Sequence, residues 1–307
     1  MTEFKDHPLY KVHTIDTAMS SIWDFYRKNF LVLFFLSAVI AFVMQYISSF
    51  IDMTDLQNET DPMVMLEKIK GLAMPLMMVS LLNLLLTTIL QHYILFKPVD
   101  SSNNVMTSVI KAFKYYLPYL IILIILSFVG AIAVVLGLLA LVVGAVFAAI
   151  YILTLYLFIL PVMMTEGANI GNTISRVFAL AHRNFWSNIG WVSVFFVILL
   201  AISLVLSGII LLPFTGSFIK TLFNPEDAAA AVDITKNPLF IILSALVNAL
   251  TLPLMPIFAG VLYFNARARE EKKEPEYQPE KEENSVRVED LYAKPYSDEH
   301  PENPENK

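Results

Sequence analysis

A continuous apolar stretch of 48 residues, from Leu117 to Met164, constrains the fold of this chain more than any other feature. As a single helix it would be about 70 Å long, more than twice the roughly 30 Å hydrocarbon core of a bilayer. It must therefore fold back on itself. Because Gly137 lies near its midpoint and Gly144 follows, we predict a tight turn at residues 136–140.

Four other stretches have the length and composition of membrane-spanning helices, and the chain is 57% hydrophobic with only 16% charged residues. The runs do not alternate, which argues against barrel strands. The sequence therefore predicts an all-α, polytopic membrane domain over residues 14–268, between an N-terminal segment (1–13) and a charged, disordered tail (269–307). The six predicted spans are residues 30–51, 73–96, 117–137, 140–163, 188–213 and 239–264.

The lysines and arginines are distributed unevenly between the two sides of these spans. Of the 21 in the chain, 17 fall in the terminal segments and the connections on one side, and 4 fall on the other. Positive residues are retained on the cytoplasmic side of a membrane. We therefore expect a multi-pass protein of the bacterial cytoplasmic (inner) membrane with both termini in the cytoplasm.

A short amphipathic segment precedes each odd-numbered span, at residues 15–26, 105–116 and 170–185. Expected caps are Thr14, then Ser101 or Ser102, then Asn169 or Asn172. We predict three repeated units, each an interfacial elbow helix followed by a transmembrane hairpin. The first and third elbows end in matching basic and aromatic junctions, which either only fix helix depth or form a rim that holds lipid headgroups or a partner. The junctions are Arg27-Lys28-Asn29-Phe30 and His182-Arg183-Asn184-Phe185.

The third unit, from Pro161 to Gly190, resembles the membrane domain of some bacterial glycerophosphodiester phosphodiesterases and related six-span bacterial families. The six-span layout extends the resemblance over residues 10–268, and Val177 departs from it where a Ser is common. The resemblance implies a fold and no catalytic activity, because the sequence includes no phosphodiesterase domain. The matching residues are Pro161, Glu166, Ile174, Arg176, Arg183, Phe185, Trp186 and Gly190.

Glu166, just beyond the fourth span, is the best single candidate for a role. It could form a structural ion pair with Arg176 or Arg183. Alternatively, Arg176, His182 and Arg183 meet a lipid phosphate while Glu166 orients them, since guanidinium groups suit that geometry.

No Asp, Glu, Lys or Arg lies inside the six predicted spans, which argues against a proton-driven transporter. Asn83 and Asn248 fall near mid-bilayer, where we expect hydrogen bonds between helices in preference to a substrate site. Pro253 and Pro256 must kink or unwind the sixth span, either as a static kink or as the wall of a cavity.

The sequence contains no cysteine, no cluster that indicates a catalytic, metal or cofactor site, and no basic footprint for nucleic acid. We therefore predict a non-enzymatic integral membrane protein that acts as a scaffold or accessory factor in envelope or lipid organisation. The alternative is a lipid or amphiphile carrier with a cavity near the kinked sixth span. Expected partners are membrane lipids and, through residues 286–296 of the tail, a protein; the sequence does not indicate an oligomeric state.

Overall fold

The computed structural model describes residues 2–51, 61–139, 141–167, 169–216 and 236–273, and these contain helices and no strand. Six helical segments are long and apolar enough to cross a membrane, which confirms the all-α, six-span prediction. The predicted disorder and protein-docking motif of the tail fall on residues 274–307, outside the described residues. The candidate spans are Phe30–Ser48, Pro62–Phe96, Val105–Leu139, Leu141–Glu166, Phe185–Phe214 and Pro238–Lys272.

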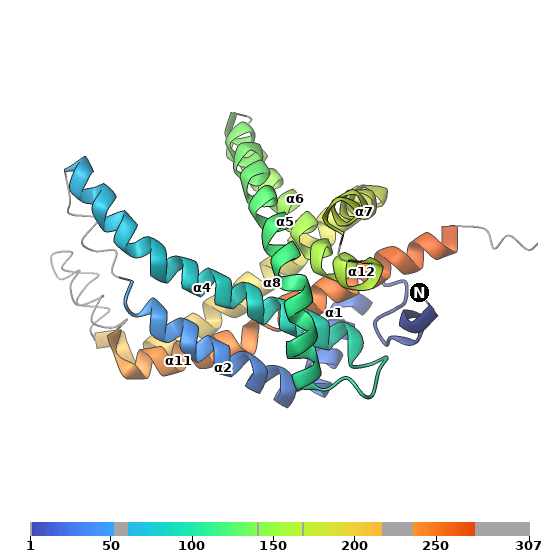
Figure 1. Ribbon diagram of the computed structural model, residues 1–307, viewed down its shortest axis with the longest axis horizontal. Helices are drawn as coiled ribbons and strands as arrows, with labels where there is room; N and C mark the ends of the chain where they lie inside the picture. Colours follow the sequence, from blue (N-terminus) through green and yellow to red (C-terminus); the bar gives the residue numbers. More distant parts are fainter. Residues whose placement is uncertain (1, 52–60, 140, 168, 217–235, 274–307) are drawn as a thin grey trace, which may run out of the picture. The chain divides into compact units, whose positions relative to one another are not determined.

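Nine α-helices account for the described chain, together with two short 3-10 turns at Thr2–Asp6 (η1) and Leu212–Phe214 (η2). α5 and α6 run side by side, and α2 lies beside α11 (Figure 1). The helices are α1 (Ile15–Lys28), α2 (Phe30–Ser48), α4 (Pro62–Phe96), α5 (Val105–Leu139), α6 (Leu141–Glu166), α7 (Ile170–Arg183), α8 (Phe185–Leu211), α11 (Pro238–Thr251) and α12 (Leu254–Lys273).

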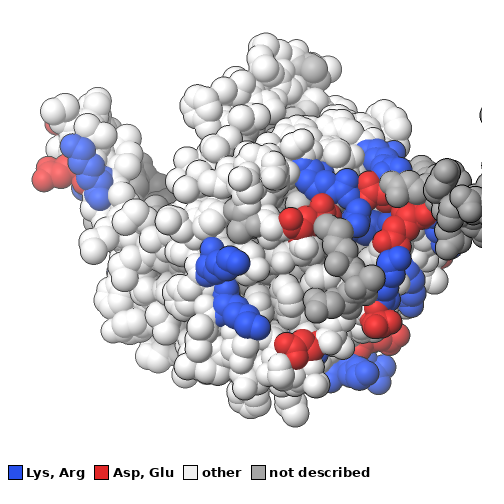
Figure 2. All heavy atoms as spheres, turned by 45° about the vertical axis from the view of Figure 1, so that its right-hand side comes forward, with Lys and Arg blue, Asp and Glu red and all other residues white. Residues whose placement is uncertain are grey.

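Apolar side chains cover much of the protein surface. Leu139, Leu141 and Val143 are each at least 77% exposed. Figure 2 shows charged residues gathered on one part of the visible face and at a separate tip, with broad uncharged surface between them. Such a surface is costly in water and is suited to contact with lipid.

Side-chain caps begin several helices, as the sequence predicts. The Thr14 hydroxyl accepts from the Thr17 amide, and the Asn169 side-chain Oδ1 accepts from the Asn172 amide. The expected Ser101 or Ser102 cap of the second elbow is wrong. The Ser102 hydroxyl instead lies 2.6 Å from the carboxylate of Asp100, and the Asn104 side chain accepts from the Thr107 amide at 2.8 Å.

Two of the three expected elbows are separate helices, and the middle one is not. Asn29 and Asn184 have non-helical backbone angles, so α1 ends before α2 and α7 ends before α8. Residues 105–116 instead continue into α5 without a break. The threefold repeat therefore remains a prediction, with the second unit departing from the other two.

The α5–α6 hairpin turns later than the sequence suggests. α5 continues through Gly137 to Leu139, and Leu141 begins α6 with a φ of 70°. Gly137 packs against the facing helix, because a Cβ there would lie 2.6 Å from the Gly144 carbonyl oxygen. The glycines thus permit the close approach of two helices.

The N-terminal segment is packed into the bundle instead of extending from it. His7, Leu9 and His13 are each at most 2% exposed. The His7 Nδ1 accepts from the Leu9 amide at 3.1 Å, so its Nε2 donates to the carbonyl of Ile94 at the end of α4, at 3.0 Å. The His13 amide donates to the Asn265 side chain on α12 at 2.9 Å. These contacts join the segment to two spans.

The sixth span is interrupted where its prolines predict it. α11 ends at Thr251 and α12 begins at Leu254, so Pro253 lies between them and Pro256 lies in the first turn of α12. The Tyr26 hydroxyl of α1 donates to the Leu250 carbonyl at 2.9 Å. A side chain from another helix thereby satisfies a carbonyl at the interruption.

Candidate functional site

Glu166 lies at the end of α6, where its carboxylate joins three helices. Arg176 on α7 donates from Nε to Oε2 at 2.8 Å, and the Tyr263 hydroxyl on α12 donates to Oε1 at 2.9 Å. The Nε of Arg267 lies 3.7 Å from Oε1. The Glu166 side chain is only 14% exposed, so these partners offset the loss of hydration of a buried charge.

The pairing of Glu166 with Arg176 agrees with the structural ion pair expected from the sequence. The sequence analysis did not single out Tyr263, at the end of the predicted sixth span, or Arg267, just beyond it, although the fourth span ends on the same side. Because both spans end on the same side of the membrane, the sequence could have indicated that residues near 263–267 lie close to Glu166. A pocket of about 320 Å³ opens between α6 and α7, with Glu166 and Arg176 among its lining residues.

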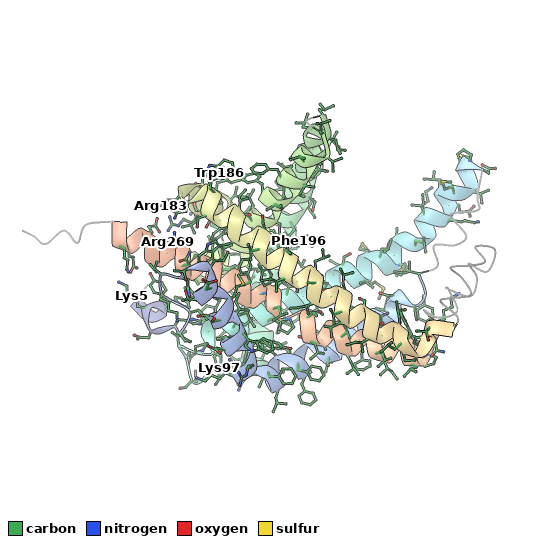
Figure 3. The ribbon with its side chains drawn as sticks, turned by 180° about the vertical axis from the view of Figure 1, so that it is seen from behind. Lys5, Lys97, Arg183, Trp186, Phe196 and Arg269 are labelled. Atoms are coloured by element: carbon green, nitrogen blue, oxygen red, sulfur yellow. The ribbon has the colours of Figure 1, made fainter. Side chains whose placement is uncertain are left out.

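His182 and Arg183 do not join Glu166. The His182 Nδ1 donates to the Phe178 carbonyl at 2.9 Å, and its Nε2 accepts from the Tyr151 hydroxyl at 3.3 Å. Six residues along α7 separate His182 from Arg176, about 9 Å of helix. Arg183 and the 74%-exposed Trp186 lie near each other at the junction of α7 and α8 (Figure 3).

Arg27 and Lys28 end α1, and both are exposed. Lys28 lines a pocket of about 370 Å³ together with Lys11 of the N-terminal segment and Lys97, the residue that follows α4. Arg27 does not line it. The sequence therefore identified one member of this basic pocket and missed the other two, because they lie 17 and 69 positions away along the chain.

Asn83 and Asn248 do not make the expected bonds between helices. Both residues are exposed, and in the described structure the bonds at these positions use their main-chain carbonyls. The Thr87 hydroxyl donates to the Asn83 carbonyl at 2.9 Å, and the Thr251 hydroxyl lies 3.4 Å from the Asn248 carbonyl. The helical phase of each span decides which residues face inward, and it points these asparagines outward.

An apolar groove of about 890 Å³ lies along α5 and α6, with Met255 of α12 in its wall. We call it the hairpin groove. Ser127 and Tyr156 contribute the hydroxyl groups in an otherwise aliphatic lining. From Leu123 to Val135 the lining follows about 18 Å of α5. The remaining lining residues are Leu126, Gly130, Ala131, Val134, Ala149, Ile152 and Leu153.

A narrow recess of about 10 Å³ adjoins the hairpin groove, because Tyr156 and Met255 line both. Thr87, Gln91 and Tyr119 also line the recess. Gln91 is 1% exposed, and its Nε2 has no hydrogen-bond partner in the described structure. A Cβ on Gly260 would lie 3.8 Å from that nitrogen. Buried amide donors are normally paired. The recess has room for about one water-sized atom, so a single oxygen is the largest acceptor that fits beside this amide.

Histidine, aspartate and glutamate do not form a metal-binding group of three within the residues that the structure describes. The predicted membrane-domain resemblance rests on residues now placed in α6, α7 and the start of α8, where Glu166 and Arg176 pair directly. Comparison with known proteins found no matching family model, no matching curated sequence and no matching solved structure.

Proposed function

We propose that this integral membrane protein binds a lipid or lipid-like amphiphile in the hairpin groove. The observation that carries the proposal is the unpaired Gln91 amide at the narrow recess where the groove meets the interrupted sixth span. An apolar chain fits the aliphatic lining, and an ester carbonyl or hydroxyl oxygen fits the Gln91 donor. The groove therefore suits the apolar part of an amphiphile, and Gln91 suits its polar part.

The physical reason lies in the cost of leaving Gln91 unpaired. A buried donor without a partner costs about 1–3 kcal/mol. The Thr87 hydroxyl already donates to the Asn83 carbonyl at 2.9 Å, and the Tyr119 and Tyr156 rings pack with their centroids 6.3 Å apart. An acceptor that reaches Gln91 removes the penalty, while the chain along α5 covers apolar surface.

The scaffold role rests on the absence of a chemical motif in the sequence, on the elbows and on the tail, whose residues 274–307 lie outside the described residues. The hairpin groove and its recess are lined in part by the sixth span, through Met255, Pro256 and Ala259, which supports the cavity expected beside that span. We therefore prefer the lipid-handling role over the scaffold role.

The test fills the groove and measures retained lipid. Ala131 and Ala149 face the groove from α5 and α6, so the variant Ala131→Trp/Ala149→Trp should lose an amphiphile that the unchanged protein retains. Native mass spectrometry after mild detergent extraction measures the retention. Ala201→Trp is the matched control, because Ala201 is exposed on α8 and lines none of the described pockets. Equal retention in both variants would contradict the proposal.

A labelling experiment locates the chain directly. A phosphatidylglycerol with a photoreactive group on its acyl chain should label peptides from residues 123–135 and 149–156 above those of α8. Uniform labelling of all six candidate spans would mean ordinary bilayer contact and would also contradict the proposal.

A further inference from the structure

A second pocket, of about 370 Å³, is built from three parts of the chain that are distant in sequence. Lys11 comes from the N-terminal segment, Lys28 from the end of α1, and Lys97 from the residue after α4. We call it the lysine pocket. Lys97 lies next to α1 in Figure 3.

Positive charge dominates the lysine pocket. Three lysines and one aspartate, Asp24, line it, which leaves an excess of two positive charges. Lys97 donates from Nζ to the carbonyl of Ser101 at 3.0 Å, and an ammonium group has two further donors. The side chains of Lys11 and Lys28 form no ion pair within the described part of the chain. The pocket can therefore receive an anion.

The part of the chain that carries Lys11 is held firmly. Leu9, which lines the pocket, is 2% exposed, and its amide donates to the buried His7 ring. Arg269 donates to the His13 carbonyl at 3.1 Å on the other side of Lys11. Lys11 thus lies between two anchored residues. Folding therefore already restricts the backbone at Lys11, and less conformational entropy is lost when the three ammonium groups bind one ligand.

The chemistry and the position of the pocket together select its ligand. Ammonium groups bind phosphate as point charges. Asn29 also lines the pocket, and it directly precedes α2, the first candidate span. A basic pocket at the end of membrane-spanning helices lies at the level of lipid headgroups. We propose that the lysine pocket binds the phosphate group of an anionic membrane lipid, separately from the amphiphile in the hairpin groove.

The experiment titrates the purified full-length protein, in a neutral detergent, with phosphatidylglycerol and with phosphatidylcholine of the same acyl chains. Native mass spectrometry counts the bound lipid. We expect saturable binding that prefers phosphatidylglycerol. The variant Lys11→Gln/Lys28→Gln should bind it about 30-fold more weakly, because each lysine near an anionic headgroup contributes about fivefold.

Matched variants separate a pocket from general surface charge. Lys111→Gln/Lys114→Gln removes two exposed lysines from α5, outside the pocket, and should leave the affinity close to that of the unchanged protein. Lys11→Arg/Lys28→Arg keeps the charge and should retain binding. Equal losses in the two glutamine variants, or no loss in either, would overturn the proposal. Unchanged thermal unfolding of the pocket variant shows that it is folded.

Two further experiments distinguish a lipid phosphate from free phosphate, and distinguish the lysine pocket from the hairpin groove. Inorganic phosphate should compete only weakly with phosphatidylglycerol; full competition at equal concentration would replace the lipid with a soluble anion and overturn the proposal. The groove-filling variant Ala131→Trp/Ala149→Trp should keep its preference for phosphatidylglycerol at the lysine pocket. Loss of that preference would show that a single lipid site, the groove, explains the binding.

Discussion

The hydroxyl of Tyr26 donates a hydrogen bond to the main-chain carbonyl of Leu250 over 2.9 Å, across 224 positions of sequence. This bond connects α1 to the interrupted sixth span. Burial raises the pKa of Tyr26 to about 12, so the hydroxyl keeps its proton at physiological pH. The elbow helix therefore contributes directly to the stability of the interruption.

Replacing that hydroxyl should destabilise the protein. Tyr26→Phe leaves the Leu250 carbonyl without this donor, and we expect the free energy of unfolding to fall by about 1–3 kcal/mol. Denaturant titration in detergent micelles measures the change. Tyr46→Phe is the control, because Tyr46 is 60% exposed on α2 and should lose little. Equal losses of unfolding free energy in the two variants would show that the Tyr26–Leu250 hydrogen bond does not stabilise the protein.

A methyl group at Gly137 should force α5 and α6 apart. The new Cβ would lie 2.6 Å from the Gly144 carbonyl oxygen, a contact that requires the backbone to shift. We expect Gly137→Ala to lower stability by about 1–3 kcal/mol. Gly208→Ala on α8 is the matched control, since a Cβ there meets nothing within 4 Å and alanine favours helix. Stability retained in both variants would rule out close packing at Gly137.

The N-terminal segment should loosen in acid. Burial lowers the pKa of His7 from 6.5 to about 4 and also lowers the pKa of His13. The unfolded chain therefore binds more protons than the folded one between these values, so the stability of the docked segment falls as the pH drops from 6.5 towards 4. Hydrogen exchange of residues 2–13 measures this loss.

A variant that lacks both histidines is the control for that experiment. His7 faces Ile94, Phe25 and Phe264, while His13 is affected by the charge of Lys11. The variant His7→Gln/His13→Gln removes both titrations. The protection factors of the segment, which are exchange rates corrected for the intrinsic pH dependence of amide exchange, should then be nearly independent of pH in this window. A pH dependence that persists unchanged would assign the effect to other groups.

The Glu166–Arg176 pair should show strong energetic coupling. A double-mutant cycle with Glu166→Gln and Arg176→Gln isolates their interaction from the remaining contacts of each residue. We expect about 1.5–3 kcal/mol, since the bond is charge-assisted and the side chains are 14% and 26% exposed. The same cycle between Glu166 and the exposed Arg27 should give a value near zero. A near-zero value for Arg176 as well would remove the pair from the forces that hold α7 to α6.

Replacing Gln91 should separate stability from ligand retention. Gln91→Leu removes the unpaired buried amide, so the ligand-free protein should gain about 1 kcal/mol of stability. The same change should weaken retention of an amphiphile in the hairpin groove, because the donor at the recess is lost. Thermal unfolding and native mass spectrometry measure the two effects. A gain in stability with unchanged retention would place the ligand's polar group elsewhere.

The number of spans and the interruption of the sixth follow from length, apolarity and proline, all of which are local properties. Gly137 illustrates the limit of local reasoning. Glycine near the middle of an apolar run predicts both a turn and close packing, and the helix continues through it because the facing Gly144 is available. The sequence could not show that the helix would continue to Leu139 and that the positive φ would fall at Leu141.

The candidate site shows the same limit. The pair Glu166–Arg176 is ten residues apart, within one helix–turn–helix, and sequence reasoning could pair them. Asn83 and Asn248 appeared equally suited to join helices, yet both are exposed. The orientation of a helix about its own axis depends on its neighbours, and a uniformly apolar span carries little sequence signal for it.

The sequence by itself determined that this chain is a bundle of six apolar helices, because chain segments of that length and composition satisfy their backbone polar groups and suit a bilayer only as helices. Tertiary structure alone decided the sites. It brought Tyr263 and Arg267 to Glu166, Lys11 and Lys97 to Lys28, and Gln91 to the recess beside the hairpin groove. These partners come from different parts of the chain, and only the packing of helices and segments on one another sets which distant residues meet.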